Sequence, residues 1–156
     1  MKDDPNEADS ALRPGEVAIA LPAATDAGVY FIGVIRTPWH RRSECPKRGE
    51  PDGPICSIVV DQRWRAALTD VAQYKRIQVL YWMHQARRDL VLQTPFRTGQ
   101  TTGSFALRSP VRPNPIASSV VDLVAVEGTT LLVRGLDCLD GTPLIDLKPE
   151  RTSPGG

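Results

Sequence analysis

The distribution of proline and glycine constrains how this chain can fold more than any other feature. Fourteen prolines and twelve glycines, gathered in clusters, divide the 156 residues into short apolar segments. Short segments rich in β-branched and aromatic residues, separated by turn formers, are typical of a mainly β domain. We identify at most eight candidate strands, at residues 16–21, 29–36, 55–61, 76–84, 103–109, 119–128, 129–136 and 142–149.

A helix and two turns are predicted between these segments. Residues 63–74 have apolar side chains spaced as on one helical face, at Trp64, Ala67, Leu68 and Val71. Glu127-Gly128 and Asp140-Gly141 indicate turns, because glycine adopts the positive φ that tight turns require.

The expected architecture is a single-sheeted closed β-barrel. An open sheet of so many short strands would expose its edges, and closure removes them. We therefore predict a mainly β fold with one or two short helices, over residues 15–150. The polar segments 1–14 and 151–156 are expected to be disordered.

Charge excludes one way of binding nucleic acid. With 19 Lys and Arg against 18 Asp and Glu, the net charge of +1 gives no attractive field over the whole protein. Any RNA contact must come from a local patch. Six basic residues fall within 13 positions, Arg36, His40, Arg41, Arg42, Lys47 and Arg48, and the alternative is a solvated basic loop.

The cysteines and histidines predict no metal site. Cys45, Cys56 and Cys138 form no CxxC pair, which argues against a disulfide framework or structural zinc and favours a cytoplasmic location. The chain shows neither an apolar signal segment nor a run long enough to cross a bilayer, so no membrane is expected. The motifs of Rossmann, P-loop and hydrolase folds are absent.

Two long Arg-rich loops, at residues 37–54 and 85–103, are expected to serve function rather than packing. After the second loop, Pro110, Pro113 and Pro115 stiffen the backbone around three polar side chains, Arg108, Arg112 and Asn114. Such rigidity suits a binding site, although a surface connector would have the same composition.

Three further polar residues stand near predicted strand ends. For Asp140, in its turn, capping of nearby backbone N–H groups is favoured. Asp137 could instead meet a cationic or hydroxyl-bearing ligand, beside backbone carbonyls of residues 136–139 that could accept from an adenine amino group. His84 should emerge where the fourth strand ends, where a structural role is the more common one.

Five segments together resemble the TsaA-like family. They are IGVIRTPW (32–39), CPKRG (45–49), MHQ (83–85), GSFALRSPVRPNPIASS (103–119) and LDCLDGTPLIDLKP (136–149). The resemblance implies a homodimeric β-barrel that binds S-adenosylmethionine and methylates N6 of threonylcarbamoyladenosine at position 37, in the anticodon loop of tRNA. It also implies a cofactor site at Pro46, Lys47, Arg48, His84, Gln85, Arg108, Leu136, Asp137, Cys138 and Leu139.

No catalytic residue is identified outright; Asn114 and Arg112 are the candidates. Substrate binding is expected from Arg41, Arg42, Arg112 and Asn114, because guanidinium groups pair with carboxylates and phosphates. Two alternatives stay open. One is a methyltransferase of the same fold acting on another RNA or a small molecule, and the other is a non-catalytic protein that binds or senses S-adenosylmethionine.

The chain departs from the family pattern in places that bear on the substrate. Lys47-Arg48 replaces Arg-Gln after Pro46, Ala117 stands where glycine is usual, and Glu150 stands where tyrosine is common. The segment before the fourth strand lacks the family's F-S-H-x-W, and the sequence ends just after the expected barrel, where some members continue into an extra C-terminal region.

Overall fold

The structure is a computed structural model that describes residues 11–151. Chain contacts divide these residues into two compact units. The barrel unit comprises residues 26–84 and 116–151, and the small unit comprises residues 11–25 and 85–115.

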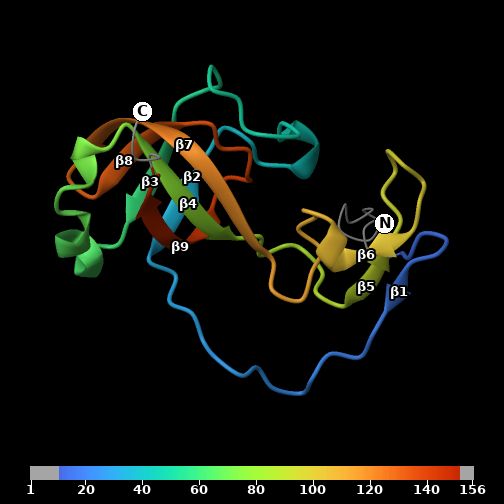
Figure 1. Ribbon diagram of the computed structural model, residues 1–156. Helices are drawn as coiled ribbons and strands as arrows, with labels where there is room; N and C mark the ends of the chain where they lie inside the picture. Colours follow the sequence, from blue (N-terminus) through green and yellow to red (C-terminus); the bar gives the residue numbers. More distant parts are fainter. Residues whose placement is uncertain (1–10, 152–156) are drawn as a thin grey trace, which may run out of the picture. The chain divides into compact units, whose positions relative to one another are not determined.

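The barrel unit is a closed barrel of six antiparallel strands (Figure 1). The strands are β2 (Gly33–Arg36), β3 (Cys56–Val60), β4 (Arg76–Trp82), β7 (Ile116–Glu127), β8 (Thr130–Arg134) and β9 (Thr142–Pro149). Their order around the barrel is β2-β3-β8-β7-β4-β9, and pairing of β2 with β9 closes the ring. The predicted mainly β fold with a closed barrel is confirmed.

The core lies inside the barrel and follows from strand alternation. In β4 the buried residues are Ile77, Val79 and Tyr81, every second position. Ile35, Leu144 and their counterparts on β3, β7 and β8 meet these side chains. Alternate positions of the strands therefore supply apolar side chains to the inside of the barrel, while the outward positions are mixed, as with Gln78 and Leu80 on β4.

The small unit contains a second sheet that the sequence did not predict. It has three strands in the order β1-β5-β6, namely β1 (Val17–Ala18), β5 (Leu90–Gln93) and β6 (Thr102–Gly103). The expectation of a single sheet, and of a strandless loop at 85–103, was therefore wrong. The barrel itself occupies only part of the 15–150 range expected for it.

The predicted strand at 103–109 is mostly wrong as well. The strand ends at Gly103, and the 3-10 helix η5 (Ser104–Ala106) follows. Buried Ser104 donates to the Leu90 carbonyl and accepts from Gln93, so its side chain ties the turn to β5. These hydrogen bonds favour the turn at Ser104 over the strand that the apolar composition of the segment predicted.

Other strand boundaries differ at their ends. Residues 16–21 supply only the two-residue β1, and residues 29–32 precede β2 outside any strand. Strand β7 begins at Ile116, three residues earlier than predicted, because its register with β4 continues to Trp82.

The prediction of one continuous helix at 63–74 is wrong. Two 3-10 helices, η3 (Gln62–Leu68) and η4 (Val71–Gln73), take its place, because Asp70 between them has a left-handed φ of 69°. The predicted apolar face is correct in part, since Trp64, Leu68 and Val71 pack against the barrel core. Within residues 11–151 no α-helix forms, and none of the helices is long and apolar enough to span a membrane.

Both predicted turns occur, with a φ of 64° at Gly128 and 82° at Gly141. Near the N-terminus, Arg13 donates to the Thr94 carbonyl and lies over the Phe96 ring, although residues 1–14 were expected to be disordered. The rest of that expectation, for residues 1–10 and 152–156, lies outside the described residues.

Candidate functional site

The site lies where several connections meet at one end of the barrel. Antiparallel register puts the end of β2 beside the starts of β3 and β9, and the end of β4 beside the start of β7. The loop from β2 to β3 (37–55) and the connection from β8 to β9 (135–141) therefore leave the barrel at the same end.

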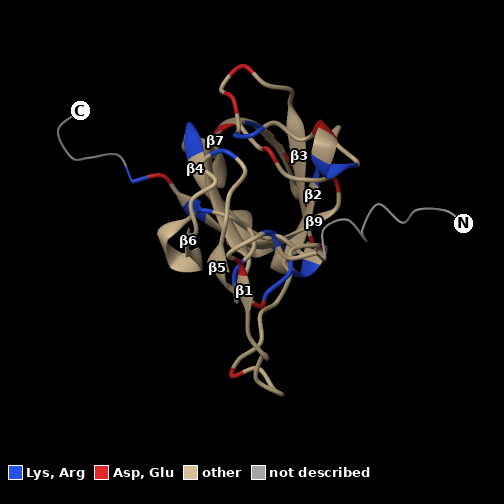
Figure 2. Ribbon diagram, turned by 90° about the vertical axis from the view of Figure 1, so that its right-hand side faces the viewer, with Lys and Arg blue, Asp and Glu red and all other residues tan. Residues whose placement is uncertain are grey.

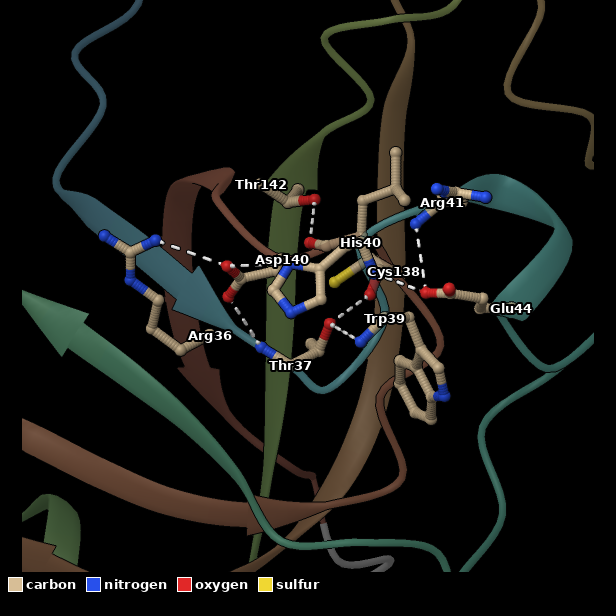
Figure 3. Close-up of polar contacts among 10 residues, drawn as sticks. Arg36, Thr37, Trp39, His40, Arg41, Glu44, Cys138, Asp140 and Thr142 are labelled. Carbon is tan, nitrogen blue, oxygen red and sulfur yellow. Dashed lines mark hydrogen bonds and ion pairs between the residues drawn. The ribbon is translucent and has the colours of Figure 1, made fainter. Parts of the chain in front are cut away.

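Thr37 and Asp140 fix the beginning of the long loop (Figure 3). The backbone N–H of Thr37 donates to Asp140 Oδ1 at 3.1 Å, and the Thr37 hydroxyl donates to the Cys138 carbonyl at 2.8 Å. Asp140 Oδ2 lies 3.5 Å from Arg36 Nη1 and 3.7 Å from His40 Nδ1. Asp140 has the structural role predicted for it, but its backbone partner lies across the barrel end rather than nearby in sequence.

A carboxylate also orders the basic part of the loop. Glu44 Oε2 accepts from the backbone N–H groups of His40 at 2.8 Å and Arg41 at 3.3 Å, which closes the 3-10 helix η2 (Arg42–Glu44). These hydrogen bonds lower the pKa of the Glu44 carboxyl. Arg41 and Arg42 are thus presented on a defined, exposed turn (basic residues are blue in Figure 2).

The end of the loop packs directly on the 135–139 segment. At Gly49, a Cβ atom would lie 1.6 Å from the Gly135 carbonyl oxygen, so only glycine allows this approach. The backbone N–H of Gly49 also hydrogen-bonds to the Asp137 carboxylate and lowers its pKa. The segments CPKRG and LDCL, separate in sequence, therefore form one surface.

A polar chain connects this surface to the barrel interior. The Tyr81 hydroxyl donates to Asp137 Oδ1 at 3.0 Å and lies 2.9 Å from Ser119 Oγ. Burial raises the pKa of Asp137 above its ordinary value, against the lowering effect of hydrogen bonds from Tyr81 and Gly49. A partly buried carboxylate is thus held by fixed donors at the barrel end.

Predicted cofactor residues from the barrel unit gather at this end. Lys47 and Arg48 are exposed and Pro46 is half-buried, in the loop against Asp137. His84 is exposed two residues after β4 ends, as predicted.

The side chains of Leu136, Cys138 and Leu139 are buried, so they can meet a ligand only through the backbone. Thr142 and Thr37 already donate to the carbonyls of Leu139 and Cys138. Burial raises the pKa of the Cys138 thiol to about 12, which keeps it neutral and unreactive.

The other predicted residues belong to the small unit. Arg112 Nη1 donates to the carbonyls of Leu107 and Ser109 at 2.9 and 3.0 Å, and so braces its own proline-rich segment. Asn114 is exposed, and its Oδ1 accepts from Arg88 Nη2 at 3.3 Å. Gln85 and Arg108 are exposed as well.

Sequence reasoning missed Tyr81 and Thr37 in the barrel unit and Arg88 in the small unit. Tyr81 had a usable signal, since it is the polar-tipped residue at an inward position of β4 and a buried phenol needs a partner. Arg88 donates to the Pro113 carbonyl at 2.6 Å and thereby orients the proline-rich segment. Thr37 lies in the IGVIRTPW segment that carries the family resemblance, but nothing in that segment indicated its bond to the Cys138 carbonyl.

No group of three or more His, Cys, Asp or Glu side chains within residues 11–151 is arranged to hold a metal ion. The acceptor groups of the site are instead the carboxylates of Asp137, Asp140 and Glu44 and backbone oxygens. Its donors are backbone N–H groups, hydroxyl groups and basic side chains. Such a set suits an organic ligand with hydroxyl, amino and carboxylate groups.

The fold and the site together define a small antiparallel barrel protein with a polar ligand site at one end of the barrel. The model of the tRNA-methyltransferase O N-terminal domain matches residues 34–152. The chain belongs to this family, which confirms the resemblance to TsaA-like proteins.

Relatives and solved structures agree with this membership. The chain is 50% identical over 141 residues to the probable S-adenosyl-L-methionine-binding protein VirR of Rhizobium radiobacter, a match that covers 90% of this chain and 81% of VirR. It is 34% identical over 86 residues to a tRNA (adenine(37)-N6)-methyltransferase of Mus musculus, covering 53% of this chain and 20% of the mouse protein.

The crystal structure of TrmO from Pseudomonas aeruginosa resembles the chain with a TM-score of 0.66 at 30% identity. The likeness covers 81% of this chain and 57% of TrmO, so the chain spans little more than half the length of that solved relative.

Proposed function

We propose that this protein binds S-adenosylmethionine and transfers its methyl group to N6 of threonylcarbamoyladenosine at position 37 of a tRNA anticodon loop. One observation carries the proposal: the fold brings the 45–49 loop onto the 135–139 segment, the two barrel segments that the family resemblance assigns to the cofactor. Membership of a tRNA-methyltransferase family supports the reaction class.

The residues at the barrel end fit this cofactor. Asp137 offers an acceptor for ribose hydroxyl or amino groups, in a partly buried position where a hydrogen bond gains strength. Exposed Lys47 and Arg48 offer cationic partners for the cofactor's carboxylate. Pro46, His84, Gln85, Arg108 and the backbone of Leu136, Cys138 and Leu139 complete the proposed cofactor set.

The protein's task in this reaction is to position the adenine nitrogen against the methyl group and to exclude water. Bound S-adenosylmethionine supplies an activated methyl group, so no metal or strong protein nucleophile is required. Orientation of the adenine nitrogen in line with that group contributes on the order of 7 to 11 kcal/mol to barrier lowering. Asn114, held by Arg88, is the proposed group for orienting the base.

Guanidinium groups are proposed to bind the substrate's charges. Arg41 and Arg42, exposed on η2, suit the phosphates of the anticodon loop, and Arg112 suits the carboxylate of the threonylcarbamoyl group. The modified base must leave its stack in the single-stranded loop to be reached. The proposal includes a homodimer acting in the cytoplasm.

Cofactor binding is tested by calorimetric titration of S-adenosylmethionine into the purified protein. We expect one site per chain, and a lower affinity for Asp137→Ala. Asp26→Ala, at an exposed position of the same unit, is the matched control and should bind normally. No binding at millimolar cofactor would contradict the proposal.

The reaction is tested on tRNA from cells that lack the methyl modification. After incubation with protein and S-adenosylmethionine, mass spectrometry of the nucleosides should show threonylcarbamoyladenosine gaining 14 Da, the mass of one CH₂ unit. If the cofactor binds and no nucleoside gains a methyl group, the tRNA substrate is wrong, and a different substrate or a sensing role takes its place.

A further inference from the structure

The buried end of β4 contains a group that neither the family resemblance nor the proposed reaction uses. Tyr81 is 2% exposed, and its ring fills the barrel core. Its hydroxyl nevertheless faces Asp137, the only carboxylate that the proposed cofactor set contains. An all-apolar core would place phenylalanine here, because a buried hydroxyl must find a partner.

The direction of the hydrogen bonds follows from proton count. A phenol has one proton, and Tyr81 donates it to Asp137 Oδ1. The contact of 2.9 Å between Tyr81 and Ser119 must then run from the serine hydroxyl to the phenol oxygen. Ser119 therefore strengthens Tyr81 as a donor, since hydrogen bonds in a chain polarise one another.

Asp137 receives donors from two sides. Tyr81 reaches it from β4, and the backbone N–H of Gly49 reaches it from the 45–49 loop. Both bonds favour the ionised carboxylate, while burial disfavours it. The ionised state of Asp137 thus depends on a small number of fixed donors.

We propose that Tyr81 is a positioning residue that holds the Asp137 carboxylate ionised and in one orientation, ready to accept hydroxyl or amino donors of S-adenosylmethionine. The inference rests on the proposed cofactor site. It predicts that Tyr81 acts on cofactor binding through Asp137 and not through core packing.

Three weaker acids lie around Asp137, namely Tyr81 on β4, Cys45 in the facing loop and Cys138 next in the chain. Burial raises the pKa of each, so they stay neutral at neutral and acid pH. The basic side chains of Lys47 and Arg48 lie in the loop that faces Asp137. Burial also raises the pKa of the Asp137 carboxyl above its ordinary value. Its protonation removes an acceptor, so cofactor affinity should fall on the acid side.

The test compares Tyr81→Phe with the unaltered chain in calorimetric titrations of S-adenosylmethionine from pH 5 to 9. The variant lacks the Tyr81 hydrogen bond, which lowers the pKa of Asp137. The fall in its cofactor affinity on the acid side should therefore begin at a higher pH. We expect a loss of affinity of about tenfold at pH 5.5 and a clearly smaller loss at pH 8.5, since a hydrogen bond to a charged group is involved. Tyr74→Phe, at an exposed position of the same unit, is the matched control and should keep the normal profile.

A second readout needs no cofactor. In carbon NMR of protein labelled at aspartate carboxyls, the Asp137 signal, assigned with Asp137→Asn, should titrate at higher pH in Tyr81→Phe. Ser119→Ala, which leaves the phenol in place, should shift the signal in the same direction by less, and it serves if Tyr81→Phe does not fold. In the Asp137→Asn background, Tyr81→Phe should change affinity by less than about twofold.

The outcomes distinguish failure of the proposed function from failure of this inference. If the unaltered chain binds no S-adenosylmethionine, the proposed function fails and this inference fails with it. If it binds, but Tyr81→Phe lowers affinity equally at every pH or leaves the Asp137 signal in place, the inference alone is overturned and Tyr81 is a core residue only.

Discussion

At the scale of single residues, the carboxylates of Asp140 and Asp137 at the barrel end have different roles. Asp140 is a structural acceptor that receives the Thr37 N–H and faces Arg36 and His40. Asp137, three positions earlier, is held in a buried setting that raises its pKa. A carboxylate kept where folding alone disfavours its charge is a mark of a binding site.

Asp140→Ala should destabilise the protein by about 1–3 kcal/mol, because the partly buried Thr37 N–H loses its acceptor. Asp140→Asn keeps an acceptor oxygen and loses only the ion pairs, so it should cost less than about 1 kcal/mol. Urea unfolding monitored by tryptophan fluorescence measures both. Equal losses in the two variants would mean that the charge, and not the hydrogen bond, matters.

Asp137→Asn should stabilise the protein at neutral pH while weakening cofactor binding. The pKa of Asp137 is raised by folding, so the folded state binds the proton more tightly than the unfolded state. The stability of the unaltered chain therefore falls as pH rises through the Asp137 titration. Asparagine does not titrate, so the stability gain of Asp137→Asn over the unaltered chain should be larger at pH 7 than at pH 4. Urea unfolding at each pH measures this difference.

At the scale of elements, the loop from β2 to β3 is held at both ends. Thr37 is bonded to the 138–140 segment at the start of the loop, and Gly49 touches Gly135 and Asp137 at its end. The basic turn of η2 lies between these anchors. Anchored ends limit the freedom of the basic side chains, which lowers the entropy cost of binding a ligand.

Gly49→Ala should displace the end of this loop, because its Cβ would overlap the Gly135 carbonyl. We expect a decrease in S-adenosylmethionine affinity on the order of tenfold, by the logic of displaced binding groups. Gly28→Ala, where a Cβ meets nothing within 4 Å, is the control and should bind normally. Unchanged affinity in Gly49→Ala would mean that the 45–49 loop does not form the site.

At the scale of the whole molecule, the residues proposed for function come from both units, and the net charge of the chain is near neutral. The barrel unit contains the Asp137 site, and the small unit contains Arg112 and Asn114. With a net charge of +1, the protein has no general attraction for RNA. The proposed binding of tRNA must then depend on particular basic residues.

The double substitution of Arg41 and Arg42 by Ala should weaken tRNA binding and lower its salt dependence. On a single strand, the slope of log affinity against log salt falls by about 0.7 for each phosphate that the protein no longer neutralises. Filter binding at several salt concentrations measures the slope. Arg63→Ala with Arg65→Ala, on the surface helix η3, is the control, and an equal change there would point to bulk charge instead.

The sequence by itself determined the closed barrel and the approximate positions of its six strands, but not the sheet of the small unit. Alternation in β4 and the glycine turns at 128 and 141 are local properties, so they could be read without coordinates. The predicted strand at 142–149 coincides with β9. The break in the helix predicted at 63–74 was missed, because the left-handed backbone at Asp70 has no sequence signal as strong as glycine.

Only the tertiary structure decided which residues meet at the site. Thr37 and Asp140 are bonded across 103 positions, and Tyr81 and Asp137 across 56. Such pairs depend on the register of strands around the barrel, and no local pattern encodes register between strands far apart in the chain. The sequence therefore indicated the carboxylate of Asp137. Only the closed barrel showed that the Tyr81 phenol and the Gly49 N–H lie beside it and hold it.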